Sequence, residues 1–284
     1  MTDEIKSLGQ AYALFSPLTN MPYVECEEED YYDRILLYAV KEDAERAVGE
    51  YEEKGIRVNV RELKTMEVYV PVDASNPGGA KKKMYLNQVR QHLGVLPFMG
   101  VNAVGYQPAG KEMKTIALVD ILPEGFEKKV EGNRLYQPNL QLTGIYLMQE
   151  ARRKKEYVDM KKLQELDEEF SSNLVKSHMF MAVLPPEGHE KDEKLNLKEC
   201  KLPYLKHQSG DNFFPLFTDL WEFQKYAQAN RKLRSVEIPF TDVTKFWVQG
   251  AKAYMLNPMG ISVPLAKEMI PKILERFGVS ENPS

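Results

Sequence analysis

The sequence predicts an α/β protein made of α+β layers, arranged as two related modules that each hold a mixed sheet with packed helices. Three observations support this fold class. Short apolar stretches alternate with helical patterns along the chain, one order of elements occurs twice, and 284 residues are enough for two domains of ordinary size. Hydrophobic residues make up 43% of the chain, which leaves side chains for a core in each module.

Two segments give the clearest sign of a repeat: GVNAVGYQPAG, from Gly100, and GAKAYMLNPMG, from Gly250. They share a glycine, an alanine, a proline and a second glycine at the same spacing, and both read as a short strand that runs into a tight turn. A strand and a helix precede each segment, ILLYAV with KEDAERAVGEYEEKG and FFPLF with TDLWEFQKYAQAN. Further upstream, AYALFSPL matches MFMAVLPP. Three elements in one order indicate a duplication.

Each of these two helices is expected to pack one apolar face on a sheet, because its apolar residues recur at helical spacing. The first face holds Ala44, Ala47, Val48 and Tyr51, and the second holds Leu220, Phe223, Tyr226 and Ala227. Thr218 or Asp219 is the expected N-cap of the second helix, and Glu222 completes a capping-box pattern with Asp219.

The repeat places the first module at residues 1–140, a linker and helix start at 141–159, and the second module at 160–284. The strand-helix units lie further apart than the glycine-proline motifs, so the first module carries an insertion near residues 71–93. Inside this insertion, the turn signal SNPGG precedes three lysines that lead into an expected helix.

Two more helices are expected in the second half of the chain. The segment from Ala151 to Phe170 has apolar residues at helical spacing on one face. A closing helix follows Pro264, and Pro271 should kink or interrupt it, since a proline inside a helix removes a hydrogen bond.

Composition argues against several classes of function. The net charge of −4 supplies no positive field for a phosphate backbone, so no nucleic-acid partner is expected. No apolar run reaches about 18 residues and the N-terminus has no signal-peptide pattern, so we expect neither membrane insertion nor export. The two cysteines, Cys26 and Cys200, lie far apart, which fits a reducing compartment and a cytoplasmic location.

The loop SNPGGAKKK is a candidate anion site. Its backbone N–H groups, together with Lys81, Lys82 and Lys83, could surround an anion at the start of a helix. The loop lacks the glycine spacing and the Lys-Ser/Thr ending of a nucleotide P-loop, and a solvated insertion is the simpler interpretation.

Three other candidate binding residues lie in the second module. Trp221 belongs to an aromatic-rich stretch that is best explained as core packing, but it falls off the apolar helix face and could contact a partner. Asn257 and Gly260 belong to the glycine-proline turn, whose surface is the expected contact region.

No pattern of residues indicates catalysis, a metal or a cofactor. His189, with Glu190, Asp192 and Glu193, has no metal-ligand spacing and reads as a charged loop. Cys26 precedes an acidic run, which should raise the pKa of a thiol and so disfavour a nucleophile. Neither a Gly-x-Ser-x-Gly elbow nor a Gly-x-Gly-x-x-Gly turn occurs.

Three motifs in the second copy carry a family resemblance: FMAVLPP, FFPLFTDLWEFQKY and AYMLNPMGISVPLAKEMIPKIL. With these motifs, the chain from about Met160 onward resembles the enhanced serine sensitivity (SseB-like) family of bacterial proteins. The resemblance implies a cytoplasmic α/β domain and brings no catalytic residues. The first copy departs from the pattern, because Tyr38-Ala39 stands where Phe217-Thr218 stands and Gln107 replaces Asn257.

We therefore expect a non-catalytic binding or regulatory module that contacts a protein partner or a second copy of itself, with no cofactor and no metal. Two alternatives stay open. One is a small-molecule enzyme with its site in a cleft between the modules. The other is a self-assembling scaffold that uses an exposed face such as the one carrying Trp221.

Overall fold

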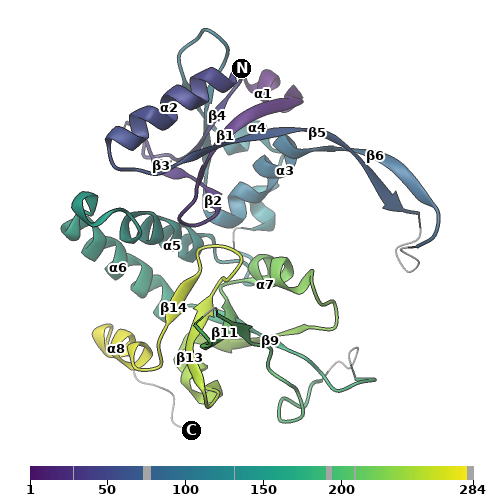
Figure 1. Ribbon diagram of the computed structural model, residues 1–284, viewed down its shortest axis with the longest axis vertical. Coiled ribbons are helices and arrows are strands. Elements are labelled where there is room, and N and C mark those ends of the chain that lie inside the picture. The colour runs from purple at the N-terminus through teal and green to yellow at the C-terminus, as the bar shows by residue number, and fades with distance from the viewer. Residues whose placement is uncertain (28, 73–77, 131, 190–193, 208, 280–284) are drawn as a thin grey trace. The chain divides into compact units, whose positions relative to one another are not determined.

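The computed structural model describes residues 1–27, 29–72, 78–130, 132–189, 194–207 and 209–279. The chain divides into two compact units (Figure 1). The first unit contains Met1–Pro17, Pro22–Pro97 and Val101–Lys129, and the second contains Leu18–Met21, Phe98–Gly100 and Val130–Ser284. Each unit has a mixed sheet with helices, which confirms the expected fold class. Of the described helices, none is long and apolar enough to span a membrane.

The sheet of the first unit has the strand order β6-β5-β1-β4-β7-β8, with β3 beside β4. The elements up to Lys129 are α1 (Thr2–Ser7), β1 (Gln10–Ser16), β2 (Met21–Pro22), β3 (Val24–Cys26), β4 (Asp33–Tyr38), α2 (Lys41–Glu53), β5 (Asn59–Pro71), β6 (Lys81–Asn87), α3 (Gln88–Val95), η1 (Leu96–Met99), β7 (Ala103–Gln107), β8 (Lys114–Ala117), α4 (Leu118–Ile121) and η2 (Glu127–Lys129).

The sheet of the second unit has the strand order β12-β9-β11-β13-β14, with β10 beside β11. The elements after Lys129 are α5 (Pro138–Ala151), η3 (Lys155–Tyr157), α6 (Met160–Val175), β9 (His178–Val183), β10 (Leu205–Lys206), β11 (Asn212–Phe217), α7 (Leu220–Ala227), β12 (Arg234–Pro239), η4 (Phe240–Phe246), β13 (Ala251–Leu256), β14 (Val263–Leu265) and α8 (Met269–Arg276).

The two sheets share one topology. The central strand, β4 or β11, pairs antiparallel with β1 or β9 and parallel with β7 or β13. The outer strands correspond too: β5 and β12 pair with β1 and β9, and β8 and β14 pair with β7 and β13, all antiparallel. The register follows the sequence repeat, because Leu37 pairs with Tyr106 and Leu216 with Leu256. The repeated sequence therefore corresponds to a repeated topology.

In both units the helix after the central strand packs on the sheet with its expected face. Tyr38 of β4 shares a buried cluster with Ala44 and Ala47 of α2. In the second unit, Phe217 of β11 shares one with Phe223 of α7. The central strands are buried over several consecutive residues, as expected for strands with a parallel neighbour and a covered face.

Strand β5 extends beyond the sheet of the first unit and forms a two-stranded arm with β6 (Figure 1). Residues 59–64 of β5 pair with β1, whereas residues 65–71 pair only with β6. The three lysines Lys81, Lys82 and Lys83 lie in β6 together with Met84, so the helix expected after them begins later, at Gln88. Cross-strand pairing continues to Asn87, whose side chain caps α3 by accepting a hydrogen bond from the N–H of Arg90.

The helices expected at 151–170 and after Pro264 begin later than their patterns suggest. Helix α5 ends at Ala151, and α6 begins only at Met160, because the carboxylate of Asp159 caps it. Helix α8 begins at Met269, which places Pro271 in its first turn. A proline there removes no intrahelical hydrogen bond, so the expected kink is absent from α8.

Candidate functional site

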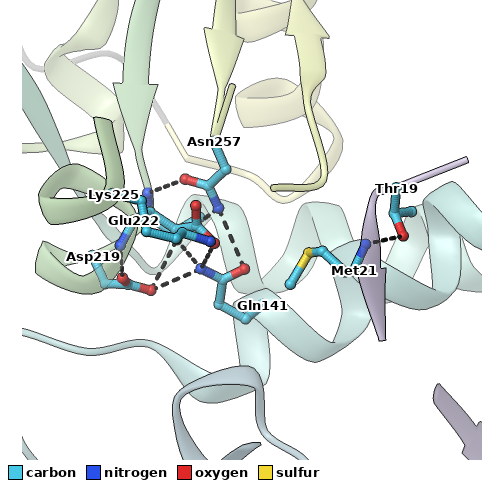
Figure 2. Close-up of polar contacts among 8 residues, drawn as sticks. Thr19, Met21, Gln141, Asp219, Glu222, Lys225 and Asn257 are labelled. Atoms are coloured by element: carbon cyan, nitrogen blue, oxygen red, sulfur yellow. Dashed lines mark hydrogen bonds and ion pairs between the residues drawn. The ribbon is translucent and has the colours of Figure 1, made fainter. Parts of the chain in front are cut away.

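A buried polar cluster lies where β11 leads into α7 in the second unit (Figure 2). Because β11 and β13 are parallel neighbours, their carboxyl ends lie at the same edge of the sheet and bring the residues after them together. We call the cluster the junction network. Its members are Gln141 of α5, Thr218 and Asp219 after β11, Glu222 and Lys225 of α7, and Asn257 after β13. All of them except Lys225 have no exposed surface.

Asn257 holds the strand ends together with its amide. Its Oδ1 accepts a hydrogen bond from the backbone N–H of Thr218 at 2.9 Å, and its Nδ2 donates to the Thr218 hydroxyl at 2.9 Å and to Gln141 Oε1 at 3.3 Å. Its φ of +48° lies in the left-handed region, which asparagine tolerates better than most residues. The residue type therefore suits both the turn and the hydrogen bonds.

Gln141 links α5 to the first turn of α7. Its Nε2 lies 2.8 Å from Thr218 Oγ1, 3.0 Å from Asp219 Oδ2 and 3.1 Å from Glu222 Oε1 (Figure 2). Asp219 also caps α7, because its Oδ1 accepts a hydrogen bond from the Glu222 N–H at 2.9 Å. The predicted N-cap at Asp219 is confirmed. The Glu222 side chain, which was expected to complete a capping box, instead accepts hydrogen bonds from Gln141 and Lys225.

Glu222 is the least compensated member of the junction network. Its Oε1 accepts a hydrogen bond from Lys225 Nζ at 2.7 Å, whereas its buried Oε2 has no hydrogen-bond partner among the described residues. Gly260 lies against this carboxylate, since a Cβ on Gly260 would come within 2.8 Å of Oε1 and 3.0 Å of Oε2. A glycine at this position is therefore needed for the close approach of the turn to Glu222.

Burial raises the pKa of both carboxyls in the junction network. For Asp219, hydrogen bonds from the Glu222 N–H, Gln141 and Thr218 oppose the effect of burial. For Glu222, burial again raises the pKa and the Lys225 ammonium opposes it. Because neither carboxyl is exposed, the arrangement ties two strands and two helices together and offers no surface to a substrate.

An apolar groove opens beside this network on the second unit, with a volume of about 700 Å³. We call it the α7 groove. Its charged lining residues are Lys201 and Lys225, and its largely apolar wall includes Leu184, Leu202, Pro203, Tyr226, Leu233 and Met259. Met259 belongs to the same turn as Asn257 and is 56% exposed, so the network positions a hydrophobic side chain at the rim of the groove.

The predicted binding residues occupy different surroundings. Asn257 and Gly260 meet in the junction network and are buried, so their own side-chain positions are not available for contact. Trp221 is half-buried, stacks on Phe98 with ring centres 6.1 Å apart, and has Lys225 Nζ 3.8 Å from its ring centre. Its expected exposure is therefore only partial.

Other sequence candidates lie elsewhere or outside the described residues. The residues Glu190, Asp192 and Glu193 beside His189 are not described. Within the described ranges, no group of three His, Cys, Asp or Glu side chains could hold a metal ion. Burial and the charge of Glu199 raise the pKa of the Cys200 thiol, which disfavours a reactive thiolate.

Sequence reasoning did not identify Gln141, Lys225 or the role of Glu222 beyond capping. Gln141 lies in LQLTGIYLMQ, where one polar residue interrupts an apolar run of helical period. Such a pattern indicates that Gln141 is buried and hydrogen-bonded, because a buried amide needs partners.

One family model matches the chain: the SseB protein N-terminal domain, over residues 159–272. The matched segment contains β9, β11, α7, β13 and five of the six network residues by position, Thr218, Asp219, Glu222, Lys225 and Asn257. It covers less than half of the chain. No curated protein sequence matches the chain.

Two solved structures match at low similarity. Tic22 from Plasmodium falciparum is 12% identical, with 98% of each chain covered and a TM-score of 0.19. Anabaena Tic22 (protein transport) is 8% identical, with 100% of this chain and 99% of that chain covered and a TM-score of 0.21. TM-scores of this size do not establish a shared fold. The family match, by contrast, confirms the resemblance carried by the aromatic and turn motifs: the second module of this chain is similar to the SseB protein N-terminal domain over residues 159–272.

Proposed function

We propose that this protein is a non-catalytic binding or regulatory module and that the α7 groove is a contact surface for a protein partner. The observation that carries the proposal is the contrast between the groove and the junction network. The groove is apolar and accessible, whereas the carboxylates that could perform acid-base chemistry are fully buried and hydrogen-bonded to their own unit.

The network supports such a role by making the groove rigid. Asn257 fixes the turn that presents Met259, and Glu222 holds the ammonium of Lys225 at the groove wall. A preorganised apolar surface loses less conformational entropy on binding than a mobile one. The buried members of the junction network thus contribute to binding without contacting the partner.

The charge of the groove restricts the partner's chemistry. Lys201 and Lys225 are its charged lining residues, and both are positive. We therefore propose that the partner contributes an apolar side chain together with a nearby carboxylate, since complementary charge favours the correct register. The aromatic Tyr204, 58% exposed, lies at the same surface and is suited to such a contact.

A dye can test the groove before any partner is known. The probe is 8-anilinonaphthalene-1-sulfonate, an apolar aromatic anion that matches the lining and the two lysines. We expect saturable fluorescence enhancement, and we expect Met259→Glu and Lys201→Glu each to weaken dye binding by about tenfold or more, because each places a negative charge beside the bound anion. Met160→Glu is the matched control, because Met160 is 69% exposed at the start of α6 and is not a lining residue.

The protein-partner part of the proposal needs a second measurement. Proteins enriched from the source cell with the wild-type chain are compared with those enriched with Met259→Glu and with Met160→Glu. A partner that is lost with the first variant alone is then purified and titrated against all three chains. Equal affinity for all three chains, or turnover of a small molecule by the wild type, would contradict the proposed function.

A further inference from the structure

The arm of the first unit has no counterpart among the described residues of the second. We define the arm as residues 65–72 and 80–87, the part of the β5–β6 hairpin that leaves the sheet. In the second unit, the corresponding strand β12 ends at Pro239 and η4 follows at once. Since both units build the same sheet, the arm is not required by the shared topology.

The arm exposes apolar and aromatic side chains on both of its faces. The register places Met66, Val68, Val70, Met84 and Leu86 on one face, and Tyr69 and Tyr85 on the other. Tyr85 is 69% exposed, Tyr69 62%, Met84 44% and Met66 40%. An isolated two-stranded hairpin is at best marginally stable in water, so a partner that covers these apolar side chains would stabilise the arm.

The arm also has open edges. Strand β6 is the last strand of its sheet among the described residues, and beyond the hydrogen bond from the Thr65 N–H to the Gly9 carbonyl, β5 is flanked by β6 alone. An open edge presents unpaired backbone N–H and C=O groups to an added strand. The edge therefore offers hydrogen bonds as well as apolar contacts.

Positive charge marks one end of the open strand. Lys83 forms an ion pair with Glu67, and its hydrogen bond lowers the pKa of that carboxyl. Lys81 and Lys82 are exposed and form no ion pair with any described residue. The whole chain carries a net charge of −4, so these lysines are a local positive patch on an acidic protein.

We propose that the arm is a docking element for an acidic, extended segment of a partner protein, which adds to β6 as a new strand. The edge supplies backbone hydrogen bonds, Lys81 and Lys82 meet carboxylates, and Met84 and Leu86 meet apolar side chains on one face. A lipid bilayer fits less well, because hydrocarbon cannot satisfy the open backbone groups of a ribbon.

This pairing predicts the pattern of the partner segment. Consecutive acidic residues should lie opposite Lys81–Lys83, because these lysines alternate between the two faces. Apolar residues should then alternate with polar ones opposite Met84–Asn87. Two end-capped peptides carry this pattern in the two possible directions: Glu-Glu-Glu-Val-Thr-Val-Thr and its reversed sequence.

The test titrates both peptides, labelled with fluorescein, into the full-length chain and follows fluorescence anisotropy. We expect one of them to bind, and the double variant Lys81→Gln with Lys82→Gln to weaken this binding by about tenfold or more. The matched control is Lys111→Gln with Lys114→Gln, which removes the same charge at and before β8, the other end strand of the sheet. It should leave the affinity unchanged.

Two further arms of the experiment separate strand addition from simple charge attraction. N-methylation of alternate backbone amides of the peptide should abolish binding if the edge hydrogen bonds are used. Vesicles of anionic phospholipid should not bind the chain through Lys81 and Lys82. Absence of peptide binding, insensitivity to N-methylation, equal weakening by the control variant, or lysine-dependent vesicle binding without peptide binding would each overturn the proposal.

Discussion

The two units place an acidic and a basic side chain at corresponding positions of the helix that follows the central strand, but only the second unit buries its acidic side chain completely. In the first unit, Asp43 pairs with Arg46, whose side chain is 63% exposed. In the second, Glu222 pairs with Lys225, and the glutamate is 0% exposed. An exposed pair contributes little to stability, whereas a buried pair is costly to break. The same sequence pattern is therefore expected to contribute differently to the stability of the two units.

The difference arises at the residues before the helix. In the second unit Thr218 and Asp219 precede α7 and bring the pair into a polar network, whereas in the first unit Val40 precedes α2 and no side chain caps it. Asn257 closes the network at the position that Gln107 occupies in the first unit. The topology is therefore compatible with an apolar or a polar junction, and only the polar one depends on a complete set of partners.

The largest expected effect is at Asn257. Asn257→Ala removes the acceptor for the Thr218 N–H and a donor to Gln141, so that buried polar groups lose their partners. We expect a loss of about 4 kcal/mol in the free energy of unfolding, from two or three such groups. The measurement is urea denaturation followed by tryptophan fluorescence, because Trp221 and Trp247 both lie in the second unit.

Gln107→Ala is the matched substitution in the first unit. Gln107 pairs through its backbone, since its carbonyl accepts the Ala39 N–H, and this bond survives the change. We expect a cost below about 1 kcal/mol. Equal effects of the two substitutions would show that the network is not what stabilises the β11–α7 junction.

The units should also respond in opposite directions to pH. Full burial lowers the pKa of His92 in the first unit from 6.5 to about 4, and Arg61 adds to the effect. Below pH 6.5 the unfolded chain takes up a proton that the folded unit excludes, so its stability falls as the pH falls, by up to about 3 kcal/mol. The carboxyls of Asp219 and Glu222 have raised pKa values, so the folded second unit binds protons more readily than the unfolded chain. Its stability should therefore rise as the pH falls towards 4.5.

Hydrogen exchange measured by mass spectrometry at pH 7 and pH 5 separates the two trends, after correction for the intrinsic exchange rate. Peptides from α2 and α3 report the first unit, and peptides from α7 and β13 report the second. His92→Leu should remove the slope of the first unit, and Glu222→Gln should reduce that of the second. Slopes of the same sign in both units would refute this assignment.

The buried ion pair is expected to have the next largest effect. Lys225→Met leaves Glu222 without its cation, and we expect a loss of about 2 kcal/mol at pH 7 that shrinks at pH 5, where the buried carboxyl is more easily protonated. Arg46→Met in the first unit should cost less than about 0.5 kcal/mol at either pH. Urea denaturation of each variant at pH 7 and pH 5 provides the four losses in the free energy of unfolding. A pH-independent loss for Lys225→Met would mean that packing, not charge, is lost.

The fold class and the repeated order of elements could be predicted from the sequence because their signals are local. The apolar strands, the helix faces and the motifs at Gly100 and Gly250 each follow from a few neighbouring residues, and the register of β7 and β13 agrees with them. The arm was harder to predict, because β6 forms only through pairing with β5, and a lysine run before a helix pattern does not reveal that pairing.

The junction network illustrates what local patterns miss. Asp219 was identified as a cap because its partner, the Glu222 N–H, is three residues away. Gln141 and Asn257 are 116 residues apart, and their contact depends on how α5 packs on the unit. Which of two equivalent ion pairs is buried likewise depends on this distant helix, and no pattern within α2 or α7 contains that information.

The smallest effects are expected from alanine substitutions at Gly260 and Gly49. Neither glycine has a φ in the left-handed region, so alanine introduces no backbone strain at either position. Gly260→Ala would place a Cβ 2.8 Å from Glu222 Oε1, so the carboxylate must move away from Lys225 and Gln141. We expect this movement to lower the free energy of unfolding by about 1.5 kcal/mol. Gly49→Ala has nothing within 4 Å of its Cβ in the middle of α2 and should stabilise the first unit by about 0.5–1 kcal/mol through helix propensity. Thermal denaturation checks both signs. If Gly260→Ala is neutral, Glu222 can shift freely inside the second unit, and the network is then too loose to fix Met259 at the groove.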